Sequence, residues 1–270
     1  MNYHSNEWVM EQIHRHYEHA LTIYDKEQIV GVFCQGSTNY GLDTELSDID
    51  TKCILVPSFK DIAMNKKPVS TTNVLPNNEH LDAKDIRLYM NTFEKQNLNF
   101  LEILFTPYEI LNPKFQKEWS RLVAAREKIA RMNPYRAVKS MYGIAMEKYH
   151  AMCHPYPSKL DILAKLGYDP KQLHHLLRVE EYLERYIDGE MYAACLRPRN
   201  PGYLVAVKLG LYSLDEAKSI ADLAKAHIEA MTANFCEKTE NATNQEALDL
   251  LDDVQYNIML LAVKGEIGNV

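Results

Sequence analysis

Hydrophobic residues are spaced differently in the two parts of the chain, and the spacing changes near residue 110. In the first part, short apolar runs such as Ile29–Phe33 and Cys53–Val56 have the length of buried strands. The segment Ser5–Tyr24 places its apolar residues on one side of a helix, so we expect it to pack under a sheet. The polar segment 57–78, with three prolines, is expected to be a connector or an irregular hairpin, although its position also suits a mobile flap.

The second part of the chain carries helix signals almost throughout. Three positions place a capping side chain before a proline, and two segments fit a capping box. These are Asn112-Pro113, Asn133-Pro134 and Asp169-Pro170, and Ser213–Glu216 and Thr243–Glu246. We therefore predict an α+β protein. Residues 1–110 would form a small mixed β-sheet core with an N-terminal helix, and residues 111–270 an all-α bundle of five or six helices that closes over one edge of a cleft.

The composition is that of an ordinary globular protein, with 46% hydrophobic and 25% charged residues among 270. No run approaches the roughly 20 apolar residues that a membrane helix requires, and the polar N-terminal segment does not resemble a secretory signal. Five cysteines at scattered positions are typical of reduced thiols rather than a disulfide framework. We expect a cytoplasmic protein without a membrane partner.

Charge is distributed unevenly along the chain. The net charge of −7 argues against a broad surface for polyanions. Residues 113–148 nevertheless hold nine Lys or Arg against three Glu. This segment would either contact the phosphates of a nucleic acid or form helix faces paired with the acidic remainder of the chain. A zinc site at His150, Cys153 and His154 is disfavoured, because no matching second pair of ligands accompanies it.

The chemistry of the chain is concentrated in the stretch GSTNYGLDTELSDID, residues 36–50. In a strand, residues i and i+2 point to the same face, so Asp48 and Asp50 would project together while Ile49 turns into the core. Two adjacent carboxylates repel each other, and a divalent cation relieves that repulsion. The Gly36-Ser37 turn offers backbone N–H groups and a hydroxyl, which suit a phosphate. This combination indicates an enzyme that handles nucleoside triphosphates.

The pattern G-S-x(10)-D-x-D resembles the signature of the polymerase-beta-type nucleotidyltransferase superfamily. Within it, the stretch is most similar to a branch of stand-alone bacterial and phage nucleotidyltransferases. The resemblance implies a small mixed sheet, a third carboxylate on a neighbouring strand, and two magnesium ions, for which Mn²⁺ is an alternative. It also implies transfer of a nucleoside monophosphate with release of pyrophosphate.

Residues 79–85 contain the candidates for the third carboxylate. Asp85 stands where the N-cap of a following helix belongs, which gives it a structural role. Asp82, in the short strand before that helix, is the favoured catalytic and metal-binding candidate, with Glu79 as the fallback. Lys52 continues the alternation of Asp48 and Asp50, so it would either neutralise triphosphate charge or form a salt bridge to a nearby acid.

A second candidate group for nucleotide binding lies on the helix that Asp169-Pro170 begins. Lys171, His175 and Arg178 fall at i, i+4 and i+7, which makes one polar stripe near the helix N-terminus. The stripe would either bind the phosphates or a second anionic substrate, or be a solvated face paired with nearby glutamates. The segment resembles a K-x-G-Y-D-x-K-x-x-x-H-x-x-R pattern of the same nucleotidyltransferase branch, which favours the first interpretation. The two blocks of resemblance together span roughly residues 29–190.

Three functions are consistent with these patterns. The leading one is a magnesium-dependent nucleotidyltransferase that moves a nucleoside monophosphate, with AMP favoured, onto a hydroxyl of a small molecule, an RNA 3′ end or a protein. The second is an inactive relative that senses nucleotides or acts as a partner in a toxin–antitoxin or phage-defence pair. The third is a phosphotransferase or nucleotide hydrolase with the same metals. The acceptor, the preferred base and the oligomeric state do not follow from the sequence.

Overall fold

The computed structural model describes residues 3–45 and 47–268, which form two compact units. The first (unit 1) consists of the chain before Asn133 and after Ala242, and the second (unit 2) is Asn133–Ala242. The predicted α+β class is confirmed, with an N-terminal helix, a five-stranded mixed sheet and a helical C-terminal region. The predicted domain boundary after residue 110 and the closing of a cleft stay predictions. In the described part of the chain, no helix combines the length and hydropathy that spanning a bilayer requires.

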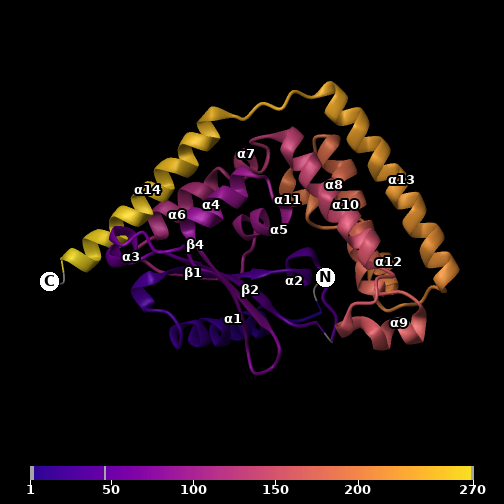
Figure 1. Ribbon diagram of the computed structural model, residues 1–270, viewed down its shortest axis with the longest axis horizontal. Coiled ribbons are helices and arrows are strands. Elements are labelled where there is room, and N and C mark those ends of the chain that lie inside the picture. Colours follow the sequence, from indigo (N-terminus) through magenta and orange to yellow (C-terminus); the bar gives the residue numbers. More distant parts are fainter. Residues whose placement is uncertain (1–2, 46, 269–270) are drawn as a thin grey trace. The chain divides into compact units, whose positions relative to one another are not determined.

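Unit 1 is a sheet with helices on both faces (Figure 1). Its strands are β1 (Ile29–Gln35), β2 (Asp50–Leu55), β3 (Ser70–Val74), β4 (His80–Asp85) and β5 (Glu109–Leu111). Its helices are α1 (Asn6–Leu21), α2 (Ser37–Tyr40), α3 (Phe59–Ala63), α4 (Ile86–Glu94), α5 (Leu98–Leu101), α6 (Gln116–Ala124), α7 (Arg126–Ala130) and α14 (Gln245–Ile267), with 3-10 turns at Lys26–Gln28 and Glu102–Leu104.

The order of the strands brings three strand ends to one end of the sheet. The order is β3-β4-β2-β1-β5, in which β2 and β4 run parallel and the other neighbours antiparallel. Gln35, the last residue of β1, lies opposite Asp50, the first residue of β2. Thr51 lies beside Leu81 in the parallel pair. The chain therefore leaves β1 and enters β2 and β4 at the same end of the sheet.

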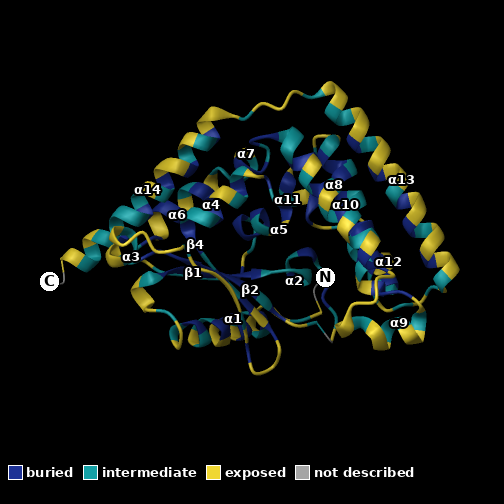
Figure 2. Cartoon of the chain, in the orientation of Figure 1, coloured by how far each residue is buried: buried dark blue, intermediate teal, exposed yellow. Residues whose placement is uncertain are grey.

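Helix α1 covers one face of this sheet, as its hydrophobic spacing predicts. It begins after Ser5, whose side chain accepts the Trp8 N–H, and it buries Val9 and Ile13 completely. These residues belong to an apolar cluster that includes Val32 of β1 and further buried residues of β2 and β4. Strands β1 and β2 are accordingly buried along almost their whole length (Figure 2).

The opposite face of the sheet is covered by helices that follow it in sequence. Phe33 of β1 is fully buried and packs its ring 4.6 Å, centroid to centroid, from Trp119 of α6. Tyr89 and Phe93 of α4 are also fully buried and meet edge to face. Helix α14 packs against α4 and α6, so the last helix of the chain belongs to the same unit as the sheet.

Unit 2 is entirely helical (Figure 1). Helix α10 is its centre, because it packs against α8, α12 and α13 and buries Leu173, Leu176 and Tyr182. The helices of this unit are α8 (Pro134–Ala151), α9 (Leu160–Leu166), α10 (Pro170–Ile187), α11 (Tyr192–Cys195), α12 (Pro201–Lys208) and α13 (Leu214–Lys238), with a 3-10 turn at Pro157–Lys159.

Most of the predicted helix starts are confirmed, and two are displaced. Asn133 and Asp169 cap their helices, and Ser213 forms the complete capping box with Glu216. Helix α14 begins one residue later than predicted, with Asn244 as the cap, because Asn is at least as good a cap as Thr.

The predicted helix start at Asn112-Pro113 is wrong. Asn112 accepts the Lys114 N–H within a turn, and α6 begins only at Gln116. Of the connector and the irregular hairpin expected for the segment 57–78, the structure contains a hairpin, since the edge strand β3 pairs antiparallel with β4, and α3 precedes it.

Candidate active site

The Gly36–Ser37 turn lies at the point where β1 becomes α2. Gly36 has φ 91° and ψ −150°, a combination that essentially only glycine adopts without strain. A Cβ added there would meet nothing within 4 Å, so the backbone conformation and not the available space selects glycine. Asn39 fixes the turn by donating to the Cys34 carbonyl at 2.9 Å. The Ser37 hydroxyl is half-buried and makes no hydrogen bond with any described residue, which leaves it available to a ligand.

Glu102 is a member of this turn that the motif does not contain. The Gly36 N–H donates to Glu102 Oε1 at 3.1 Å, and the glutamate is 2% exposed. Its only signal in the sequence is that it stands as a single charged residue inside the apolar run Leu98–Phe105. A buried charge requires a partner. The sequence therefore indicates that Glu102 makes a polar contact, but it does not indicate the partner.

Asp48 and Asp50 stand where the chain enters β2. Ile49 between them is 1% exposed and turns into the core, as the alternation predicts. Asp48 is exposed and forms no hydrogen bond or ion pair within the described chain. Asp50 Oδ1 accepts the His80 backbone N–H at 2.9 Å and lies 3.1 Å from the His80 ring Nδ1. Since Gln35 lies opposite Asp50, both carboxylates are at the same end of the sheet as the Gly36–Ser37 turn.

Glu79 supports the backbone between the two aspartates. Its Oε1 accepts the Ile49 N–H at 3.1 Å, and its Oε2 lies 3.1 Å from His16 Nε2 and accepts from Asn77 at 2.5 Å. His16, on α1, is fully buried and also lies 2.9 Å from Thr51 Oγ1. Glu79 was the fallback candidate for the third carboxylate, and in the structure its side chain is directed toward α1.

The ionisation of this pair follows from burial and hydrogen bonding. Burial lowers the pKa of His16 below its usual value, and the attraction of Glu79 only partly offsets that effect. Burial alone would raise the pKa of Glu79, but hydrogen bonds from Asn77, Ile49 and His16 outweigh it and hold the pKa below the usual range. Glu79 is therefore a carboxylate whose oxygens are already hydrogen-bonded within unit 1.

Asp82, the favoured third carboxylate, lies on the face of the sheet that Asp50 and Lys52 share. It is beside Lys52 in the parallel register of β2 and β4. Lys52 Nζ lies 2.6 Å from Asp82 Oδ2, and Thr72 Oγ1 of β3 donates to Asp82 Oδ1 at 2.9 Å. Burial alone would raise the pKa of Asp82, but Lys52, Thr72 and Lys84 outweigh it and hold the pKa below the usual value. Of the two interpretations of Lys52, the salt bridge is the one that the structure contains.

Lys84 is a neighbour of this pair that belongs to no motif of the sequence. It stands two residues after Asp82 on β4 and so points to the same face. Its Nζ lies 4.3 Å from the centroid of the Phe100 ring, and Lys52 Nζ lies 4.4 Å from the same centroid. Burial lowers the pKa of Lys84, Asp82 opposes that shift, and the charge of Lys52 adds to it.

The donor set of the aspartate pair fits a hard divalent cation. Mg²⁺ is commonly held by one or two carboxylates together with substrate phosphates and water, and Asp48 and Asp50 are two partly exposed carboxylates of that kind. No three His, Cys, Asp or Glu side chains of the described chain gather around one potential metal position. Asp82 is therefore not assembled with Asp48 and Asp50 as a three-carboxylate group, and its metal-binding role stays a prediction.

The polar stripe of α10 is found within unit 2. Lys171 is exposed, His175 is half-buried and Arg178 is 7% exposed. Burial lowers the pKa of His175 well below its usual value, and the charges of Arg178, Lys171 and Lys148 of α8 lower it further. The stripe is thus a partly buried cationic group, and its role in nucleotide binding stays a prediction.

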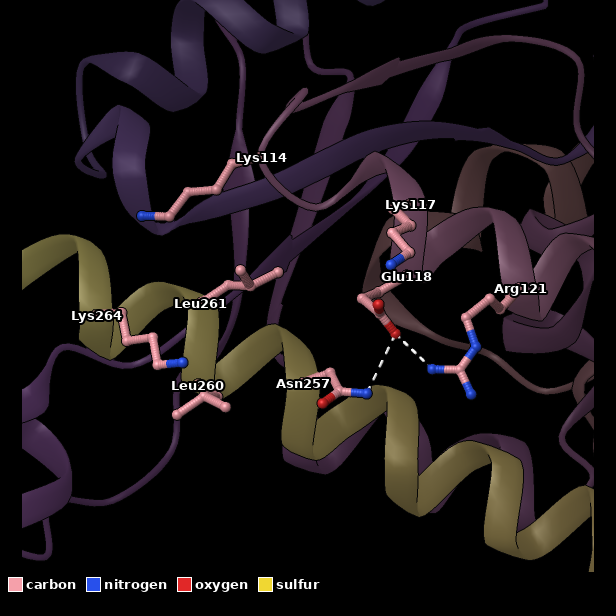
Figure 3. Close-up of a pocket in the computed structure, with 8 residues that line it drawn as sticks. All are labelled: Lys114, Lys117, Glu118, Arg121, Asn257, Leu260, Leu261 and Lys264. Atoms are coloured by element: carbon pink, nitrogen blue, oxygen red, sulfur yellow. Dashed lines mark hydrogen bonds and ion pairs between the residues drawn. The ribbon is translucent and has the colours of Figure 1, made fainter.

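Several cations of the basic segment 113–148 form ion pairs, among them Lys114, Arg121, Lys128 and Lys148. Arg121 lies 2.6 Å from Glu118 and 2.6 Å from Asp253, and Lys114 lies 3.2 Å from Glu27. A hollow of about 550 Å³ is lined by residues of α14 and of the segment 114–121, among them Lys114, Lys117 and Lys264 together with Leu260 and Leu261 (Figure 3). The pairing of Arg121 and Lys114 with acids agrees with the second of the two interpretations given for this segment.

Comparisons with known proteins add a distant structural similarity. No protein-family model matches the chain, and no curated protein matches it. Among solved structures, the chain is similar to the nucleotidyltransferase-like protein from Exiguobacterium sibiricum 255-15, with a TM-score of 0.30 and 11% sequence identity. The alignment covers 85% of this chain and 77% of the other.

Proposed function

We propose that this protein is a magnesium-dependent nucleotidyltransferase, which transfers a nucleoside monophosphate from a nucleoside triphosphate to a hydroxyl group. One observation carries the proposal. The carboxylates of Asp48 and Asp50 stand at the start of β2, at the same end of the sheet as the Gly36–Ser37 turn at the end of β1. A pair of acids that suits a hard cation thus neighbours a turn that suits a phosphate.

Each of these groups has a chemical task in the transfer. Asp48 and Asp50 would hold magnesium, with Mn²⁺ as a substitute, and the bound ion supplies charge neutralisation for the triphosphate. The Ser37 backbone N–H and hydroxyl would orient the phosphates, while the Gly36 N–H is held by Glu102 and fixes the turn. The acceptor oxygen forms a bond to the α-phosphorus while the bond from that phosphorus to the bridging oxygen breaks, and pyrophosphate leaves. Asp82 would take the proton of the acceptor hydroxyl, as the third carboxylate of the two-ion arrangement that the family resemblance implies.

The finer features of the proposal rest on composition and resemblance. We expect AMP as the transferred group, an acceptor that is a small molecule, an RNA 3′ end or a protein, and a cytoplasmic location. Within unit 2, Lys171, His175 and Arg178 would bind a second anionic group, because they lie on one stripe of α10 whose cationic charge attracts an anion.

A second function, nucleotide binding without turnover, is favoured by one observation. Asp82 is held by Lys52 at 2.6 Å and by Thr72 at 2.9 Å, so it is not free to act as a base while those contacts persist. In that case the protein would sense a nucleotide or serve as a partner protein in a toxin–antitoxin or phage-defence pair.

A labelling experiment separates these functions. Purified protein is incubated with each nucleoside triphosphate labelled at the α-phosphorus, with Mg²⁺, and with pools of small metabolites, RNA or protein. Transfer of label with release of pyrophosphate supports the transferase, and binding without turnover supports the second function. The Asp48→Asn and Asp50→Asn variants must lose transfer while keeping their fold. Glu45→Gln, at an exposed acid of the same loop, is the matched control and must keep it.

A further inference from the structure

Two lysines from neighbouring strands share one aromatic ring on the face of the sheet that carries Asp50. Lys52 Nζ lies 4.4 Å and Lys84 Nζ 4.3 Å from the centroid of Phe100. Lys52 is 6% exposed and Lys84 is half-buried, so both ammonium groups are partly removed from water. Two like charges near one ring in a poorly solvated place repel each other, and a nearby anion offsets that repulsion.

Asp82 is the anion that balances the two lysines in the structure. It lies 2.6 Å from Lys52, and its charge also acts on Lys84. Within the described residues, Asp82 is the sole acid in ion-pair contact with Lys52, and Lys84 has no ion-pair contact of its own. Two cations therefore share one carboxylate, which leaves a net positive charge beside the Asp48–Asp50 pair.

We propose that Lys52 and Lys84 form a clamp for the phosphate chain of the nucleotide, and that Asp82 is their counter-ion until that chain binds. This inference rests on the proposed function, since it names the groups that receive the triphosphate at the same site. Lys52 follows Asp50 by two residues on β2, which is about 7 Å along the strand, and the Lys84 ammonium group lies near Lys52 at the Phe100 ring. A chain of phosphates held by the aspartate pair through a cation can therefore reach both ammonium groups.

The exchange of anions explains why Asp82 is paired in the structure. A polyphosphate carries several charges and contacts both lysines at once, whereas the Asp82 carboxylate is in direct contact with one. Binding of the phosphate chain displaces Asp82 from Lys52 and leaves its carboxylate on the face that it shares with Asp50. Asp82 then becomes available for the role of the third carboxylate, so nucleotide binding and the freeing of Asp82 are one event.

The test measures binding of inorganic tripolyphosphate by calorimetry, without divalent metal and at low ionic strength, where screening is weak. Lys84→Met and Lys52→Met remove one charge each and keep the length of the side chain. Each is expected to weaken binding by about tenfold, because it removes one charge-assisted contact. Lys84→Arg keeps the charge and is expected to bind more tightly than Lys84→Met. Asp82→Asn is expected to bind about threefold more tightly or better, because the competing anion is gone.

The control variant is Lys95→Met, at an exposed lysine after α4, which must bind as the wild type does. Because Lys52 is buried, unfolding curves accompany every variant, and the half-buried Lys84 provides the test if Lys52→Met does not fold. Unchanged binding in Lys84→Met, or no tightening in Asp82→Asn, overturns the proposal. The α-label assay is run separately. Lysine-dependent binding without transfer refutes the transferase and keeps the clamp, whereas transfer with lysine-independent binding does the reverse.

Discussion

Replacement of Glu79 tests the support beneath the Asp48–Asp50 pair. Its carboxylate accepts the Ile49 N–H at 3.1 Å and lies 3.1 Å from the ring of the fully buried His16. Glu79→Ala leaves both groups buried without that partner. Each such loss costs about 1–3 kcal/mol, so unit 1 should lose about 2–6 kcal/mol of its unfolding free energy. For a unit of this size the midpoint of thermal unfolding should fall by about 5–20 °C.

The two tryptophans make this measurement specific to unit 1. Trp8 and Trp119 both belong to that unit, so tryptophan fluorescence during urea or thermal unfolding reports on it alone. Glu79→Gln keeps an acceptor for the Ile49 N–H and should cost about 1–2 kcal/mol. Glu11→Gln, at an exposed position of α1, should stay within about 0.5 kcal/mol of the wild type. An unfolding midpoint of Glu79→Ala within about 2 °C of the wild type would refute the assigned support.

Three further predictions concern the turn, the acid stability of unit 1 and the capping box of unit 2. Gly36→Ala should destabilise unit 1 by about 1–3 kcal/mol, because φ 91° with ψ −150° is strained for alanine. Gly143→Ala, with no atom near the added methyl group, should instead stabilise α8 by up to about 1 kcal/mol. Equal changes in the stability of the two variants, followed by fluorescence and circular dichroism, would contradict this. His16 is buried with a lowered pKa, so as the pH falls the unfolded chain binds a proton at this residue before the folded chain does, and the free energy of unfolding should decrease below about pH 6.5. His16→Gln should weaken this dependence of the unfolding free energy on pH in urea titrations. An unchanged dependence would exclude His16 as its cause. Ser213→Ala should lower the stability of α13 by about 1 kcal/mol, measured by circular dichroism. A loss no larger than that of Ser158→Ala, a control at an exposed serine, would argue against the cap.

The elements that the sequence predicts best are those with a buried face. Helix α1 and strands β1 and β2 have apolar residues at regular spacing, and the structure contains all three. The hairpin that contains β3 could not be ranked above a plain connector, because the residues of β3 are polar and nearly all exposed and give no hydrophobic signal. The place of β3 at the edge of the sheet follows from backbone pairing with β4, which side-chain patterns do not encode.

The candidate site likewise contains one arrangement that the sequence predicts and others that it does not. The proximity of Gly36 to the Asp48–Asp50 pair could be predicted, because a short connection joins two antiparallel strands. The Lys52–Asp82 pair could not be ranked above its alternative, because β2 and β4 are neighbours in the sheet although β3 separates them in the sequence, and their register depends on tertiary packing. The contact of Gly36 with Glu102 joins residues 66 positions apart, and nothing local in the sequence indicates it.

Release of pyrophosphate from a nucleoside triphosphate tests the central claim most directly. Wild-type protein, Asp50→Asn and Glu45→Gln are incubated with ATP, Mg²⁺ and a pooled acceptor mixture, and pyrophosphate is quantified beside free phosphate. The account predicts pyrophosphate from the wild type and from Glu45→Gln, and none from Asp50→Asn or after addition of a chelator. Equal pyrophosphate release by Asp50→Asn, or release of phosphate alone by the wild type, would contradict it.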